Sequence, residues 1–177
     1  RLHRCEFAQP TSTLMLAWRI PHTQHPDAAA LAVLSSVLGD GRAAWLYKLF
    51  HDERAIAHDT NTSILPAKQG EGAFVIEADV ERDKRDELRD ALLEYVTTLP
   101  QADFTQGVQR AQRQLKAQRV KALSTVQGCA SILGISWHHS RNTGAGEEWA
   151  QALSQVTPAD LARVAAAYLT PERLTEV

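Results

Sequence analysis

Residues 26–50 read PDAAALAVLSSVLGDGRAAWLYKLF, and this stretch decides the fold. Apolar side chains recur at helical spacing from Leu31 to Leu38, with alanines between them, so almost no polar face remains. Pro26 and Asp27 favour a helix start, because proline suits the first turn and an acid complements the positive end of a helix. The stretch therefore predicts a deeply buried helix.

A turn is expected directly after this helix. Gly39-Asp40-Gly41 is typical of a helix end at which a glycine takes the left-handed conformation. A second helix is expected from Ala43 to Glu53. A phosphate-binding loop is the alternative, but the glycine spacing fits neither the dinucleotide nor the P-loop pattern and no strand precedes it. A helix–turn–helix unit is favoured.

The rest of the chain predicts strands followed mainly by helices. Alternation and turn residues indicate strands at 14–20, 56–65 and 73–80, with further strands possible at 2–7 and 173–177. Helices are expected at 82–99, 103–123, 125–139, 147–154 and from 157 onward. This order predicts one α+β domain over residues 1–177. We expect two layers, a mostly antiparallel sheet covered by helices.

Two of these helices carry signals at their starts. Thr157 and Pro158, with an acid at Asp160, match a capping box with proline in the first turn. Asp103 is the expected cap of the long helix that reaches Leu123.

Composition excludes several classes of protein. The 177 residues suffice for one domain that buries about 70% of its unfolded-chain surface. The formal charge of −2 argues against a polyanion binder. The long helix is basic from Arg110 to Lys121 and could bind nucleic acid, but it lacks interleaved aromatic residues, so a solvated or interdomain face is favoured. No apolar run is long enough to span a membrane.

The cysteines and the chain ends restrict the class of protein less than the composition does. Cys5 and Cys129 are interpreted as buried free thiols, because their spacing supports no pairing. The sequence starts at Arg1 without a signal segment and stops at Val177 inside an expected strand, so we expect a piece of a longer protein. The compartment, periplasmic or cytoplasmic, stays open.

The seven histidines show no pattern of a metal site. A helical zinc site needs the string H-E-x-x-H or its inverted form H-x-x-E-H, and neither occurs. His22 and His25 lie in an expected loop, while His138 and His139 are adjacent and would point about 100° apart on a helix. No G-x-S-x-G elbow is present either. We therefore predict no catalytic residue, no metal site and no cofactor within this chain.

The strongest stretch extends to Ala57 and is similar to the pattern P-D-x-x-A-L-x-V-L-x-x-x-L-G-x-G-R, followed by a leucine-rich helix and a charged turn that ends in alanine. This pattern resembles the second domain of a half-molecule in the pitrilysin, insulysin and mitochondrial processing peptidase family of zinc metallopeptidases. Weaker similarity at residues 99–111 and 156–169 extends the resemblance over 14–177.

The resemblance implies a role without chemistry of its own. In that family, the zinc ligands and the general base come from an inverted motif in the first domain, which has no counterpart here. The implied role is to help form the chamber that encloses peptide substrates. The implied partners are a zinc-bearing upstream domain in cis and a second similar half.

Four positions are candidate substrate-binding residues by the same resemblance. The turn at Gly39 and Gly41 is similar in position to a glycine-rich loop implicated in substrate engagement. Some members carry an arginine and a tyrosine seven residues apart, and His51 and His58 stand at those positions here. Two histidines joined by a turn could contact a peptide backbone as hydrogen-bond donors. The alternative is that both face solvent.

A structural subunit is the rival interpretation, because the same family includes core proteins of respiratory complexes that have lost catalysis. Only the peptidase interpretation requires H-x-x-E-H upstream of Arg1.

Overall fold

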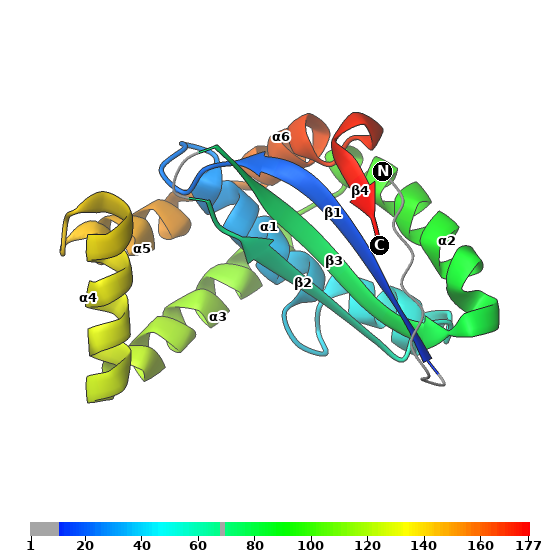
Figure 1. Cartoon of the computed structure of the whole chain (residues 1–177), viewed down its shortest axis with the longest axis horizontal. Coiled ribbons are helices and arrows are strands. Elements are labelled where there is room, and N and C mark those ends of the chain that lie inside the picture. The colour runs from blue at the N-terminus through cyan, green and yellow to red at the C-terminus, as the bar shows by residue number, and fades with distance from the viewer. Residues whose placement is uncertain (1–10, 68–69) are drawn as a thin grey trace.

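The computed structural model describes residues 11–67 and 70–177, without the side chain of His139 (Figure 1). The strand expected at 2–7 and Cys5 lie outside these residues. Within the described residues four strands form one sheet, and each neighbouring pair runs antiparallel, in the order β2-β3-β1-β4. The strands are β1 (Thr11–Pro21), β2 (Asp59–Leu65), β3 (Glu71–Glu81) and β4 (Leu174–Glu176).

Alternation in β1 determines which face of the sheet is buried. Its even-numbered residues from Leu14 to Ile20 are at most 3% exposed, whereas Thr13 and Arg19 between or beside them are exposed. In the antiparallel register Trp18 stands opposite Phe74, which is also buried. The two-residue period therefore placed the core side of β1 correctly from sequence.

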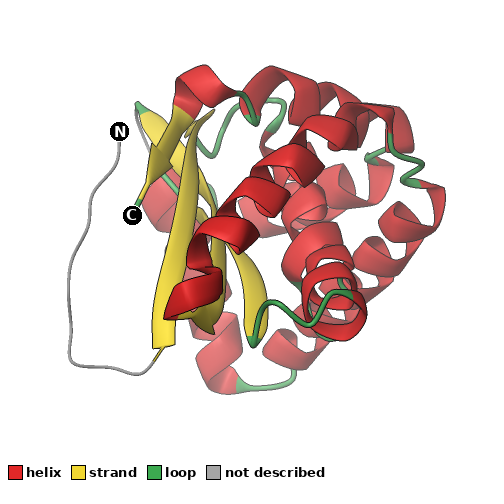
Figure 2. Cartoon of the chain, turned by 90° about the vertical axis from the view of Figure 1, so that its right-hand side faces the viewer, coloured by secondary structure: helices red, strands yellow, loops and turns green. Residues whose placement is uncertain are grey.

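The helices are α1 (Ala28–Gly39), the π-helix η1 (Tyr47–Glu53), α2 (Arg85–Thr98), α3 (Thr105–Leu123), α4 (Val126–Ser140), α5 (Ala145–Gln155) and α6 (Pro158–Tyr168). Short 3₁₀ turns lie at Arg82–Lys84, Leu99–Gln101 and Pro171–Arg173. The helices gather mainly on one side of the sheet (Figure 2). The α+β architecture is confirmed.

The helix expected from Ala43 to Glu53 differs in its start and its winding. Ala43 and Ala44 belong to the turn, and the segment from Tyr47 is wound with the wider π geometry. The N–H groups of Ile56 and Ala57 both donate to the carbonyl of Phe50, so β2 begins at Asp59 rather than at residue 56. A π-helix is rare, so the helical pattern of this segment predicts ordinary α-helix and gives no reason to expect the wider winding.

The expected helix starts differ in detail. The capping box is confirmed: Asp160 N–H donates to Thr157 Oγ1 at 3.3 Å and Thr157 N–H donates to Asp160 Oδ2 at 2.9 Å. Phe104, not Asp103, occupies the cap position of α3. Asp103 lies one residue earlier and still accepts the N–H of Thr105 at 2.9 Å.

The C-terminal half of α3 together with α4 and α5 projects from the sheet, and we call residues 112–155 the arm (Figure 1). Cys129 lies on α4 with a free thiol that is half-buried, so the expectation of a buried thiol was wrong for this residue. It lies where α4 meets the end of α3, and its Sγ contacts the carbonyl of Leu123 at 3.3 Å.

The described helices include none that is long and apolar enough to cross a membrane.

Candidate functional site

The glycine turn after α1 is held tightly by its neighbours. A Cβ added at Gly39 would lie 2.3 Å from the backbone nitrogen of Thr62 on β2, so only glycine allows this approach. The helix ends at Gly39, Asp40 after it is extended, and Gly41 has a φ of +78°, which glycine adopts at little cost. Gly39 is buried and Gly41 is exposed. Of the two predicted substrate-contacting glycines, only Gly41 is therefore exposed to solvent, and a substrate contact at either one stays a prediction.

Side chains from α1 and α3 fasten the same turn. Asp40 Oδ2 accepts hydrogen bonds from Ser36 Oγ and Gln118 Nε2, both at 3.1 Å. Arg110 donates to the carbonyl of Val37 at 3.2 Å, and partial burial lowers the pKa of its guanidinium. The negative end of α1 thus faces a cation, which stabilises the helix end.

His51 and His58 are placed differently from each other. The His51 ring stacks on Tyr47 with centroids 4.3 Å apart, and its Nδ1 lies 2.9 Å from Asp52 Oδ1. His58 is exposed, and its N–H donates to the carbonyl of Asp79 at 2.7 Å. In the described contacts the two rings do not touch each other. Their role in substrate binding stays a prediction.

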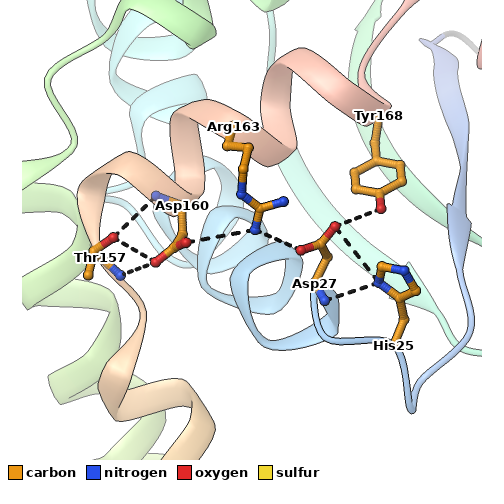
Figure 3. Close-up of polar contacts among 6 residues, drawn as sticks. All are labelled: His25, Asp27, Thr157, Asp160, Arg163 and Tyr168. Carbon is orange, nitrogen blue, oxygen red and sulfur yellow. Dashed lines mark hydrogen bonds and ion pairs between the residues drawn. The ribbon is translucent and has the colours of Figure 1, made fainter.

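A polar cluster joins the start of α1 to α6 (Figure 3). Asp27 accepts hydrogen bonds from Arg163 Nη2 and Tyr168 Oη through its two oxygens, each at 2.7 Å. Its backbone N–H donates to His25 Nδ1 at 3.1 Å. Because the Asp27 side chain is 13% exposed, these contacts replace much of its hydration.

The cluster changes the acidity of two of its members. The hydrogen bond from Arg163 holds the pKa of Asp27 below its usual value, Tyr168 adds to this, and partial burial opposes it. Burial, followed by the hydrogen bond to Asp27, raises the pKa of Tyr168. Asp27 is therefore ionised and Tyr168 neutral at pH 7. An acid that is ionised at neutral pH and hydrogen-bonded through both oxygens is suited to fasten two helices together.

A second polar contact of the same kind secures the last strand. Glu176 on β4 has a side chain that is 7% exposed, and it accepts from Arg89 Nε at 2.8 Å and Arg85 Nη2 at 3.4 Å. Both arginines lie on α2. The hydrogen bond to Glu176 raises the pKa of Arg89. The ion pair ties the C-terminal strand to the helical layer.

Sequence reasoning missed both polar contacts. Asp27 was interpreted only as a helix-start residue, while its partner Arg163 lies 136 positions later. Glu176 was placed only as part of a closing strand, and 87 positions separate it from Arg89. Neither pair has a spacing signal, because the residues meet only when distant elements pack. The position of an acid in a strand of three residues is the one local hint for Glu176.

The described residues contain no group of three or more His, Cys, Asp or Glu side chains that could hold a metal ion. His22 and His25 contact each other edge-on at 6.1 Å within the loop before α1. The polar clusters described above position helices and strands, and none pairs a nucleophile with a base.

Comparison with known proteins agrees with this picture. Residues 2–115 match the family model described as "Peptidase M16 inactive domain". The chain therefore belongs to the M16 peptidase family, as an inactive domain. This confirms the resemblance to the pitrilysin, insulysin and processing peptidase family. No curated protein matched.

Solved structures share the fold at low identity. A protease from Helicobacter pylori matches with a TM-score of 0.88 and 21% identity, over 97% of this chain and 42% of that one. A peptidase M16 inactive domain structure from Pseudomonas fluorescens matches with a TM-score of 0.85 and 16% identity, over 99% and 42%. The inactive peptidase domain of a proposed zinc protease from Bordetella parapertussis matches with a TM-score of 0.84 and 17% identity, over 98% and 94%. This chain thus spans less than half the length of the first two.

Proposed function

We propose that this chain is the non-catalytic domain of a zinc metallopeptidase, and that it helps to enclose peptide substrates beside a zinc-bearing upstream domain. The observation that carries the proposal is the match of residues 2–115 to an inactive peptidase domain. The similar Bordetella structure, of nearly the same extent, is described as such a domain of a proposed zinc protease. A second similar half completes the chamber in this proposal.

The division of labour follows from the chemistry of amide hydrolysis. A zinc peptidase needs a metal that activates water and a general base beside it. The upstream domain would supply both, through an inverted zinc motif. This chain would supply a rigid wall, because its turns and helix ends are fastened by hydrogen bonds across the fold.

Peptide cleavage by the parent protein tests the proposal. We expect the parent to cleave an unstructured peptide, a chelator to abolish cleavage, and the parent without residues 1–177 to lose it. The 177-residue chain alone should show no cleavage and should retain well under one equivalent of zinc after dialysis. A parent that binds no zinc and cleaves nothing would favour the structural-subunit alternative instead.

The histidines test whether this wall contacts substrate. Replacing His51 and His58 together by alanine in the parent should lower kcat/KM selectively for some peptides if their rings line the chamber. His138→Ala on the arm is the matched control, with no effect expected. Unchanged kcat/KM for the double variant across several peptides, with folding intact, would leave both histidines as surface residues.

A further inference from the structure

The arm contains a groove that the proposed function does not use. It lies between α3 and α5, has a volume of about 1200 Å³, and is also lined by Ile132 of α4. We call it the arm groove. Its apolar lining comes from both helices: Leu115, Val120, Leu123, Trp149 and Leu153.

Hydrogen bonds and an ion pair between α3 and α5 fix the shape of the arm groove. Gln112 at its base donates through Nε2 to the carbonyls of Leu153 and Val156, each at 3.0 Å, and so fixes the end of α5 against α3. Arg119 of α3 and Glu147 of α5 pair at 2.8 Å across it. These contacts hold the two helices apart at a set distance.

Large apolar side chains in the groove are left in solvent. Val120 is 61% exposed, Leu123 44% and Trp149 38%. Clustered apolar exposure of this kind marks an interaction surface, whereas single exposed residues do not. The neighbouring α4 adds to it, since Leu133 and Trp137 are about half exposed. The arm therefore carries apolar surface that the described residues, 11–67 and 70–177, leave exposed.

The charge beside the groove indicates what covers it. α3 contains no Asp or Glu, and Arg113 and Lys116 are exposed along the groove. Arg119 already has an acidic partner in Glu147. A segment with apolar side chains on one face and Asp or Glu on its flank would complement this arrangement.

The geometry points to the arm groove as the docking site for an acidic amphipathic helix of the parent's zinc-bearing domain. This inference rests on the proposed function. The lining is smaller than the roughly 20–30 residues a side of a stable interface between separate proteins, so a second copy would bind weakly. A tethered segment faces an effective concentration near millimolar and needs less contact. The first two similar structures are chains more than twice as long as the part matched here, which leaves room for such a segment.

Cysteine labelling measures the coverage. In a Cys5→Ser, Cys129→Ser background, Val120→Cys places a thiol in the groove, and Ala117→Cys places one on the exposed face of α3 outside it. We expect maleimide to label position 120 at least tenfold more slowly in the parent than in the 177-residue chain. Position 117 should differ by less than twofold. Cooperative melting of each variant establishes that it is folded. Equal labelling of position 120 in both proteins would overturn the inference.

Charge reversal tests the chemistry of the occupant. Lys116→Glu in the parent should restore fast labelling at position 120, whereas Lys121→Glu, on the same helix but outside the groove, should not. No difference between the two would contradict an acidic occupant. Labelling of the 177-residue chain that slows with its own concentration would assign the groove to a second copy. Protection by added unstructured peptide would assign it to substrate. Either result overturns the inference.

The docking and the proposed function fail in different ways. A parent that cleaves peptide with zinc but leaves position 120 open keeps the function and loses the docking. A parent without zinc or activity that still protects position 120 loses the function and keeps a docked segment.

Discussion

Helices α1 and α4 are both rich in apolar residues, but their surroundings differ. Nine residues of α1 are buried, including Leu31, Leu34 and Leu38. On α4 the only buried side chain in the described part is Ser136, while Val126 is 88% exposed. α1 packs between the sheet and the other helices, and α4 touches mainly its neighbours in the arm. An apolar composition therefore predicts that a helix needs a partner surface, and it does not say whether the partner lies in the same domain.

The largest expected effect compares one leucine from each helix. Leu34→Ala on α1 should lower the free energy of unfolding by about 4 kcal/mol, because the side chain is fully buried and leaves a cavity. Leu133→Ala on α4 should change it by less than about 0.5 kcal/mol, because that side chain is half exposed. Urea unfolding of the 177-residue chain measures both. Equal losses would show that α4 is covered in solution.

Ion pairs extend the comparison to charges. Glu176→Gln leaves Arg89 and Arg85 without their buried carboxylate partner, and we expect a loss of about 3 kcal/mol. Glu147→Gln on the arm removes a partner that is 83% exposed, so the loss should stay under about 1 kcal/mol. Thermal melts at pH 7 compare the two. A small effect at Glu176 would mean that β4 is not held to α2 in solution.

Alanine substitutions at one glycine of each helix should change the free energy of unfolding in opposite directions. Gly39→Ala should destabilise the protein by about 2 kcal/mol, since the added Cβ would meet Thr62 at 2.3 Å. Gly134→Ala on α4 has nothing within 4 Å of the added Cβ. It should stabilise the protein by about 0.5–1 kcal/mol through helix propensity. The denaturant midpoints of both variants measure these changes, provided that the dependence of the unfolding free energy on denaturant concentration stays the same. A stabilised Gly39→Ala variant would contradict the close approach of Gly39 to Thr62.

The smallest expected effect is a dependence on pH. The pKa of Asp27 is lowered in the folded protein, so its contribution is complete above the unfolded pKa of about 4 and is lost as the pH falls through the lower folded pKa. Asp27→Asn should therefore cost about 1–2 kcal/mol at pH 7 and less at pH 2.5. Asp83→Asn, at an exposed position, is the control, and its loss at pH 7 should stay under about 0.5 kcal/mol. If Asp27→Asn lowered the free energy of unfolding equally at both pH values, the ion pair of Asp27 with Arg163 would not be the cause of the loss.

Periodicity and local chemistry were enough for most of the architecture. The alternation in β1, the buried helix before Gly39 and the capping box at Thr157 and Asp160 each depend on residues within a few positions of one another. The family resemblance rests on the same local pattern and was confirmed. The substrate contacts of Gly41 and His58 stay predictions: the structure shows where these residues lie, and the kinetic test of the histidine variants measures whether they contact substrate.

By itself, the sequence determined which segments form helices and strands and which face of β1 is buried, because these follow from side-chain spacing along a regular backbone. It also carried the family pattern. Only the tertiary structure decided the π winding of η1, the contact of Asp27 with Arg163, and the exposure of α4. These features depend on which distant elements pack together, and the spacing of residues along the chain does not indicate such contacts.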